Sequence, residues 1–293
     1  MHSRRKVLKT LGALPWLSSP LLSMVSADES CYRLRTGLNA YSFNDPLMKG
    51  EMNLFQLLDY CAEQNFDAVD LTAYYFPEYP KVPDDEYVFA IKRKAVALGL
   101  EISGTGVRND FTLADKTKRN EHVQLVKNWI PVAQKLGAPV IRIFAGAGAP
   151  AGYTREQTVA WMIEDFQECV AFGKKHGVIV AVQNHNDFIR TPEHVEYIME
   201  QVNDPWFGLI MDTGGYRSGD TYEDIAKTIK YAVNWQIKEK IFVEGQEMDT
   251  DIPRLMKVIK DSCYKGYIPI ETLGAGDPGE KVSILMEKIR VVL

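Results

Sequence analysis

The sequence predicts an α/β protein that folds as a single (β/α)8 TIM barrel over residues 28–293. From Leu34 onward, short segments rich in β-branched and aromatic residues alternate with longer amphipathic segments, which is typical of parallel βα units. Eight β-rich segments can be counted, and no GxGxxG motif follows the first of them, so a closed barrel is favoured over an open dinucleotide-binding sheet. Of the 293 residues, 46% are apolar and 25% are charged, which excludes a disordered or collagen-like chain.

The expected strands and helices follow one another in a regular order. Strands are expected at residues 35–43, 68–76, 101–107, 139–145, 178–185, 207–213, 232–238 and 266–272. Amphipathic helices are expected between them, for example at residues 53–64, 85–98, 118–136, 156–176 and 222–230. Gly99, Gly137 and Gly177 precede the third, fourth and fifth strands. Each stands where a helix ends, because glycine readily adopts the left-handed conformation of a helix C-cap.

Residues 1–27 are expected to be a twin-arginine export signal. An S-R-R-K-V-L-K motif begins at Ser3, an apolar stretch covers residues 11–25, and Val25-Ser26-Ala27 has the small-x-small pattern of a cleavage site. Two prolines and several serines interrupt the apolar stretch, so no stable membrane insertion is expected once the signal is removed. The expected location is therefore the periplasm, and the alternative is an ordinary basic amphipathic helix.

The charge balance argues against nucleic acid as a partner. The chain has 34 basic and 39 acidic side chains, a formal net charge of -5 and a pI of about 5.7. It therefore has no basic excess with which to neutralise phosphates. The sequence leaves open whether the chain forms a homo-oligomer.

Polar residues lie at the ends of the expected strands, where a (β/α)8 barrel carries its chemistry. The candidates for substrate contact in the first half of the barrel are Asn39, Tyr41, Arg108, Asn109 and Arg142. Glu244, which follows the seventh strand, is a further candidate for substrate contact. Alternatively, Glu244 or Glu239 forms an ion pair with Lys238.

The last four strands present oxygen donors at the same end of the barrel. These residues are Gln183, Asp212, Gln236 and Glu271. Carboxylate and amide oxygens suit hard cations, so the set predicts one divalent metal, Mn or Mg rather than structural zinc. Each residue alone is better explained by a capping or loop hydrogen bond. Their position on four successive strand ends favours the metal.

Two further residues at these strand ends are candidates for proton transfer. Strand side chains alternate in direction, so His185 shares a face with Gln183, and Lys238 shares a face with Gln236. An imidazole at this rim can act as a general acid or base, although a lone histidine can also be a structural hydrogen bonder. A buried Lys238 ammonium is costly unless it is paired or functional.

The strand-end motifs read, in chain order, GLNAYSF, VQNHNDF, MDTGGY, WQIKEK and PIETLG. Together with the twin-arginine start and the eight βα units, they resemble the xylose isomerase-like sugar isomerase/epimerase superfamily. The resemblance implies one divalent metal ion, with Mn expected ahead of Mg, Co or Zn. The residues that it implies as metal ligands are Gln183, Asp212, Gln236 and Glu271.

The resemblance also implies roles in catalysis. In dehydratase-like members, a His and a Lys placed as His185 and Lys238 are here handle the proton transfers. Gln183 stands where most relatives have Glu. This change lowers the expected metal affinity and disfavours the two-glutamate mechanism of the epimerases.

The expected function is a metal-dependent lyase or hydratase that acts beside the carbonyl of an unphosphorylated keto-sugar, such as a 3-keto-glucoside or a 2-hydroxy-glucal. Export favours an unphosphorylated substrate, because sugar phosphates are mainly cytoplasmic. His185, Lys238 and Glu271 are the catalytic candidates. The alternatives are a keto-sugar isomerase or epimerase and, because of Gln183, a non-catalytic periplasmic carbohydrate-binding barrel.

Overall fold

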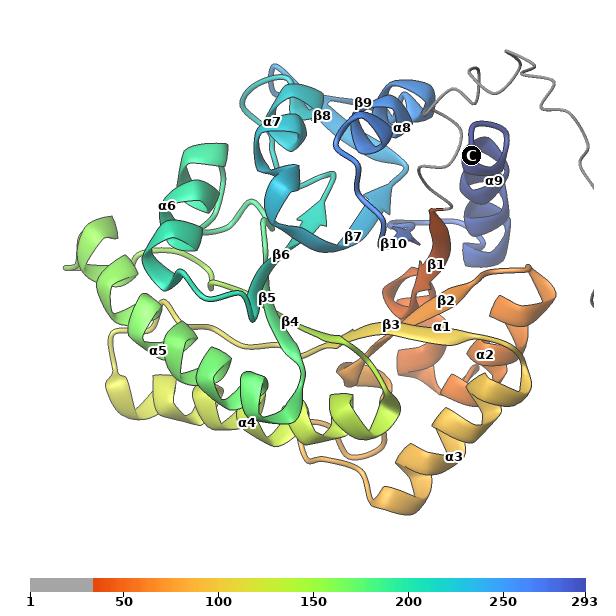
Figure 1. The fold of residues 1–293 in the computed structure, drawn as a ribbon, viewed down its shortest axis with the longest axis horizontal. Coiled ribbons are helices and arrows are strands. Elements are labelled where there is room, and N and C mark those ends of the chain that lie inside the picture. Colours follow the sequence, from red (N-terminus) through yellow and green to blue (C-terminus); the bar gives the residue numbers. More distant parts are fainter. Residues whose placement is uncertain (1–33) are drawn as a thin grey trace, which may run out of the picture. The chain divides into compact units, whose positions relative to one another are not determined.

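The computed structural model describes residues 34–293, which form a closed barrel of eight parallel strands with helices outside it (Figure 1). In order around the barrel, the strands are β1 (Arg35–Asn39), β2 (Ala68–Thr72), β3 (Glu101–Gly106), β4 (Val140–Ile143), β5 (Ile179–Gln183), β6 (Phe207–Asp212), β7 (Ala232–Lys238) and β10 (Tyr267–Glu271). Strand β10 pairs with β1 and closes the barrel. This topology confirms the predicted (β/α)8 barrel. The predicted export signal, residues 1–27, lies outside the described residues.

Helices connect successive strands. They are α1 (Asn44–Lys49), α2 (Leu54–Glu63), α3 (Asp85–Ala97), α4 (Lys116–Leu136), α5 (Arg155–His176), α6 (Pro192–Val202), α7 (Thr221–Thr228), α8 (Ile252–Asp261) and α9 (Pro278–Arg290). Thr154 and Gln157 form a capping box at the start of α5. As predicted, Gly137 and Gly177 end α4 and α5, with φ angles of 84° and 68°. Within the described range, none of the helices combines the length and apolar character needed to cross a membrane.

The first two strands end earlier than predicted. Strand β1 stops at Asn39 and is followed by a 3-10 turn, η1 (Ala40–Phe43), while η2 (Ala73–Tyr75) follows β2 in the same way. Asn39 Oδ1 accepts a hydrogen bond from the Tyr41 backbone N–H at 2.9 Å, so the side chain competes with the strand ladder and turns the backbone. As a result, Tyr41 and Tyr74 lie past the strand ends, where both line a cavity.

A small hairpin interrupts the alternation after the seventh barrel strand. Strands β8 (Lys240–Val243) and β9 (Gln246–Asp249) pair antiparallel before α8, and a 3-10 turn, η3 (Ile229–Tyr231), precedes β7. The sequence analysis did not anticipate this hairpin. It carries the chain out of the barrel directly after Lys238.

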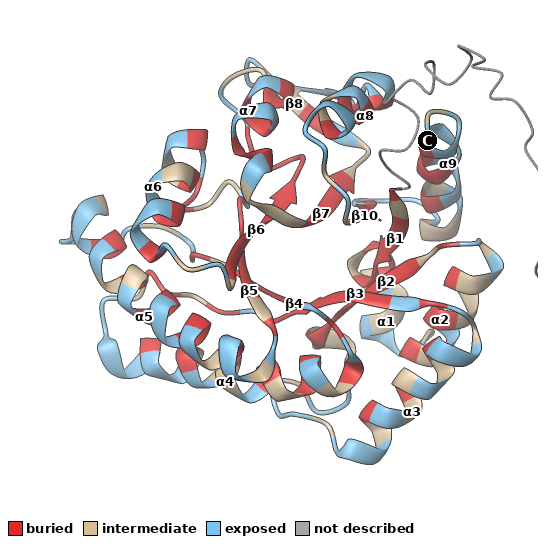
Figure 2. Ribbon diagram, in the orientation of Figure 1, coloured by how far each residue is buried: buried red, intermediate tan, exposed pale blue. Residues whose placement is uncertain are grey.

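The hydrophobic core lies mainly between the barrel wall and the surrounding helices (Figure 2). A second apolar cluster consists of Val140, Ala181 and Ile210, on three neighbouring strands. Because strand side chains alternate, Arg142, Gln183 and Asp212 point the same way as these three residues, one step closer to the carboxyl ends of the strands. A polar layer therefore lies above an apolar floor in the barrel interior.

Asp70 is a buried acid in this interior, where Asn234 Nδ2 donates to its Oδ2 at 3.1 Å. Burial raises the pKa of Asp70 to about 7, although Arg142 opposes the shift. In the unfolded chain the same group ionises at about pH 4. The free energy of unfolding should therefore fall as pH rises from about 4 to about 7 and then level off.

We expect Asp70→Asn to remove this contribution. Relaxation reduces such penalties, so the wild type should lose about 1–2 kcal/mol more than the variant between about pH 5 and about pH 8. Urea unfolding at both pH values measures the difference. Equal pH dependence in the two proteins would contradict the expectation.

Candidate active site

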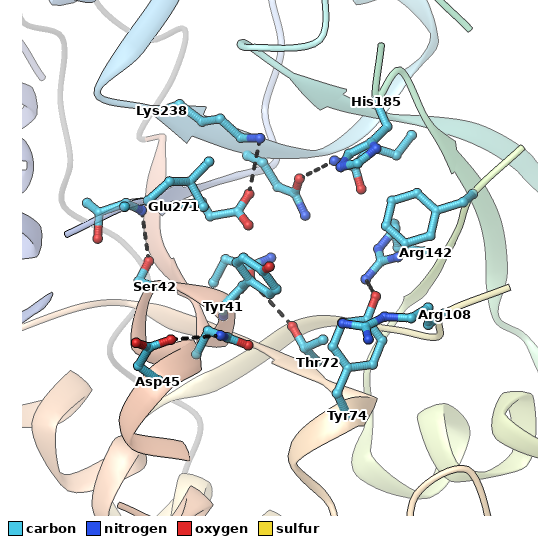
Figure 3. A pocket seen from close by; sticks show the side chains of 18 of the residues that line it. Tyr41, Ser42, Asp45, Thr72, Tyr74, Arg108, Arg142, His185, Lys238 and Glu271 are labelled. Carbon is cyan, nitrogen blue, oxygen red and sulfur yellow. Dashed lines mark hydrogen bonds and ion pairs between the residues drawn. The ribbon is translucent and has the colours of Figure 1, made fainter. Parts of the chain in front are cut away.

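A cavity of about 1320 Å³ opens at the carboxyl ends of the barrel strands (Figure 3). This is larger than the roughly 300–1,000 Å³ of most small-molecule sites. Ten of the twelve residues singled out from the sequence line the cavity: Asn39, Tyr41, Arg108, Asn109, Arg142, Gln183, His185, Gln236, Lys238 and Glu271.

The other two residues are not on the cavity surface. Asp212 is 1% exposed, and Lys238 and Gln183 both hydrogen-bond to its carboxylate. Glu244 lies at the tip of the β8–β9 hairpin, where its backbone N–H donates to Gly219 O at 3.0 Å. The hairpin leads the chain away from the rim, so the structure does not bring Glu244 to the predicted substrate site.

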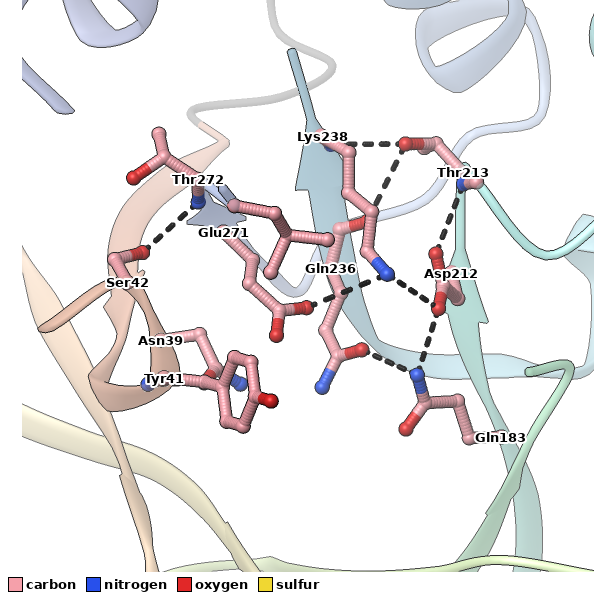
Figure 4. A network of polar contacts seen from close by, with 12 residues as sticks. Asn39, Tyr41, Ser42, Gln183, Asp212, Thr213, Gln236, Lys238, Glu271 and Thr272 are labelled. Atoms are coloured by element: carbon pink, nitrogen blue, oxygen red, sulfur yellow. Dashed lines mark hydrogen bonds and ion pairs between the residues drawn. The ribbon is translucent and has the colours of Figure 1, made fainter. Parts of the chain in front are cut away.

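A buried ionic cluster forms one wall of the cavity (Figure 4). Lys238 Nζ donates to Asp212 Oδ2 at 2.9 Å and lies 3.8 Å from Glu271 Oε2. Gln183 Nε2 donates to the same Asp212 oxygen at 2.7 Å and to Gln236 Oε1 at 2.5 Å. The five side chains thus form one connected network across β5, β6, β7 and β10, the strands predicted to carry the chemistry.

The pKa shifts in this cluster follow from burial and charge. Burial alone would lower the pKa of the Lys238 ammonium, but Asp212 and Glu271 raise it above its usual value. Burial raises the pKa of Glu271, and the nearby Lys238 opposes that shift. Lys238 is therefore a cation at neutral pH, and its charge counteracts the effect of burial on the pKa of Glu271.

A histidine–aspartate pair lies at the end of β5. His185 Nδ1 is 3.4 Å from Asp187 Oδ2, and the Phe144 ring packs against the imidazole with a centroid distance of 4.8 Å. The His185 side chain is 46% exposed, so it can reach a ligand in the cavity. The sequence analysis gave Asp187 no role, although its position two residues after His185 could have suggested the pairing.

Arginine and aromatic side chains form the opposite wall. Arg142 Nη2 donates to the Tyr74 hydroxyl at 2.6 Å, and the Arg142 guanidinium stacks 4.0 Å from the centroid of the Phe144 ring. Arg108 lies over the other ring, with its guanidinium 4.5 Å from the Tyr74 centroid. Gly106 permits this packing, because a Cβ there would lie 2.8 Å from Arg142 Nε. The sequence analysis did not identify Tyr74.

Asn109 and Asn39 use their side chains to hold the rim. Asn109 Nδ2 donates to Phe144 O at 2.7 Å, and its Oδ1 accepts from Phe144 N at 2.9 Å. Asn39 Oδ1 accepts from Thr72 Oγ1 at 3.3 Å as well as from the Tyr41 backbone. Both asparagines line the cavity, but their hydrogen bonds shape its wall.

A family model described as "Xylose isomerase-like TIM barrel" matches residues 58–290. This chain belongs to the xylose isomerase-like TIM barrel family. The predicted resemblance is therefore confirmed. No curated protein matches the sequence.

Solved structures with the same fold include two sugar epimerases and a probable dehydratase. The 3-keto-D-glucoside 4-epimerase of E. coli has a TM-score of 0.72 at 12% identity, covering 88% of this chain and 100% of the other. D-psicose 3-epimerase of Clostridium cellulolyticum H10 has a TM-score of 0.72 at 15% identity, covering 88% and 99%. A probable 3-DHS dehydratase of Bacillus anthracis has a TM-score of 0.69 at 12% identity, covering 88% and 99%. Because the sequence identities are this low, the structural likeness establishes the shared fold alone.

The divalent metal expected for a xylose isomerase-like barrel can be tested against the donor atoms. Asp212 Oδ1 accepts from Gly214 N at 2.8 Å, and its Oδ2 accepts from Lys238 and Gln183. In the part of the chain that the structure describes, no three His, Cys, Asp or Glu side chains converge as a metal-binding group. The Gln183 amide turns its NH2 group, a donor, toward Asp212. In this arrangement the donor set does not fit a divalent metal. The ligand set expected from the sequence stays a prediction.

Proposed function

We propose that this xylose isomerase-like barrel is a lyase or hydratase that acts beside the carbonyl of an unphosphorylated keto-sugar. The observation that carries the proposal is the meeting of His185, Lys238 and Glu271 in one cavity. The site therefore combines an imidazole that can move a proton with a buried cation that can stabilise negative charge on oxygen.

The reaction can be written for a 3-keto-glucoside. The carbonyl at C3 makes the C2 proton acidic, and His185 removes it while Lys238 stabilises the developing enolate oxygen. The electron pair then forms the C1=C2 double bond, the C1–O bond to the leaving group breaks, and that oxygen takes up a proton. The products are a 2-hydroxy-3-keto-glucal and the free alcohol. Addition of water to the same double bond is the hydratase direction.

Export supports the choice of an unphosphorylated sugar. We propose that residues 1–27 direct the protein to the periplasm, where sugar phosphates are scarce. A sugar also fits the wall opposite the ionic cluster, because Arg108 lines the cavity and its guanidinium can donate hydrogen bonds to sugar hydroxyl groups. The mechanism above takes no step through a metal ion, because the donor atoms do not fit one.

A keto-sugar epimerase is the second candidate. The E. coli neighbour is named a 3-keto-D-glucoside 4-epimerase, and here both His185 and Glu271 line the cavity. Two such groups on opposite faces of a substrate could exchange one proton and invert the carbon between them.

Turnover in deuterated water distinguishes these candidates. The panel contains 3-keto-glucosides, 2-hydroxy-glucals and free ketoses. A lyase should release the alcohol from a 3-keto-glucoside, and in the hydration direction it should place one deuterium on C2. An epimerase should place deuterium on the inverted carbon without releasing alcohol. Saturable binding of the panel without any turnover would contradict the proposal and indicate a carbohydrate-binding barrel.

A further inference from the structure

The point where four strand ends converge is filled by a cation that belongs to the chain. Gln183, Asp212, Gln236 and Glu271 come from β5, β6, β7 and β10. The ammonium of Lys238 lies between the two carboxylates, 2.9 Å from Asp212 Oδ2 and 3.8 Å from Glu271 Oε2. The side chains of Lys238, Asp212 and Glu271 are 13%, 1% and 7% exposed, so water screens their charges weakly.

The chain supplies its own cation to this cluster. Lys238 brings one positive charge, which pairs directly with the Asp212 carboxylate, and the two glutamines are neutral. A divalent ion at the same point would lie beside the ammonium and would have to displace it from Asp212. A Glu in place of Gln183 would add the carboxylate that such an ion prefers. The residues of this chain favour a single positive charge instead.

The Lys238 side chain is held in this position by its surroundings. The backbone N–H of Lys238 donates to Thr213 Oγ1 at 2.9 Å, which ties the end of β7 to β6. A Cβ at Gly214 would lie 3.0 Å from Lys238 Cδ, so the missing side chain at Gly214 makes room for the lysine stem. Gln183 Nε2 donates to the same Asp212 oxygen as Lys238 does. The Asp212 carboxylate is therefore occupied by donors from this chain.

We propose that the Lys238 ammonium is the resident cation of this site and that the protein binds no divalent metal there. In this arrangement Asp212 anchors Lys238 and is not a metal ligand. Gln183 Oε1 and Glu271 Oε2 are buried and accept no hydrogen bond from any residue in 34–293. Both residues line the cavity, and these two acceptors add to the excess of negative potential that the Lys238 ammonium offsets. The proposal does not depend on which reaction the site catalyses.

Metal binding by the purified full chain tests the proposal directly. After dialysis against EDTA and addition of MnCl2, ZnCl2 or CoCl2, the wild type should retain no stoichiometric metal by mass spectrometry and should show no thermal shift. The double variant Gln183→Glu/Lys238→Met adds a carboxylate and removes the ammonium. It should bind one Mn²⁺ per chain at least roughly 100-fold more tightly than the wild type, because charge count tunes cation affinity.

Lys240→Met is the matched control, since Lys240 pairs with Asp249 in the exposed hairpin and does not line the cavity. It should leave metal binding unchanged. Stoichiometric metal in the wild type that is lost in Glu271→Gln would overturn the proposal, as would a folded double variant that binds no more Mn²⁺ than the wild type. If the double variant does not fold, the metal content and thermal shift of the wild type decide the question. Since these readouts are independent of turnover, failure here is distinguishable from failure of the proposed reaction.

Discussion

His185→Ala should slow turnover of an active keto-sugar by about 10²- to 10⁴-fold, the usual contribution of a positioned general acid or base. The imidazole is half exposed at the cavity and contacts both Asp187 and Phe144. Removing it leaves the ionic cluster and the aromatic wall in place, so substrate affinity should change little. Steady-state kinetics and equilibrium binding of the same substrate separate the two quantities.

His176→Ala provides the matched control for this prediction. His176 is the last residue of α5 and its Nδ1 lies 2.9 Å from Gln134 Oε1, away from the cavity. Its removal should leave turnover at the wild-type rate. If His185→Ala also retained the wild-type rate, the imidazole would be structural, and proton transfer would have to be assigned to another group.

Lys238→Met should reduce the free energy of unfolding by about 3–5 kcal/mol, because it leaves buried carboxylates without their counter-ion. Asp212 and Glu271 pull the pKa of Lys238 up, so the stabilisation is present at neutral pH and is lost only as pH rises through that elevated value. Urea unfolding at neutral pH measures the effect, with the slope against urea checked for constancy. In the proposed reaction turnover should fall as well, because the cation assigned to the enolate oxygen is gone.

A double-mutant cycle separates the ion pair from lost packing. Lys238→Met/Asp212→Asn removes the ammonium and one carboxylate together, so it should be more stable than Lys238→Met alone. Lys240→Met, which removes an exposed lysine from the hairpin, should change stability little. A Lys238→Met protein as stable as the wild type would show that the ammonium does not neutralise the cluster.

The barrel could be predicted because its periodic signals are local. Each helix-ending glycine and each β-rich segment reports on its own neighbourhood, and eight such units have one common closed arrangement. The strand ends were harder to predict. At Asn39 a side-chain hydrogen bond ends β1 four residues before the end of the apolar pattern, and the β8–β9 hairpin has no periodic signal long enough to detect.

The sequence could predict most of the residues that line the cavity, but not the contacts between their side chains. Alternation along β5 and β7 correctly placed Gln183 with His185, and Gln236 with Lys238, on the cavity. The sequence could not show that the long Lys238 side chain turns toward Asp212, because that contact depends on the spacing between β6 and β7. The sequence also could not show that Glu244 lies in the turn between β8 and β9 and outside the residues that line the cavity.

Asn109 shows how the rim can vary without loss of the barrel. Its amide bonds both the N–H and the C=O of Phe144, so it acts as a substitute peptide unit that extends the wall one residue past the end of β4. The last polar backbone groups of that wall are thus satisfied by a residue that comes from the loop after β3. The loop at residues 147–153 therefore begins after backbone groups that already have hydrogen-bond partners. A change in the length or sequence of that loop should therefore leave the strand beneath it in place.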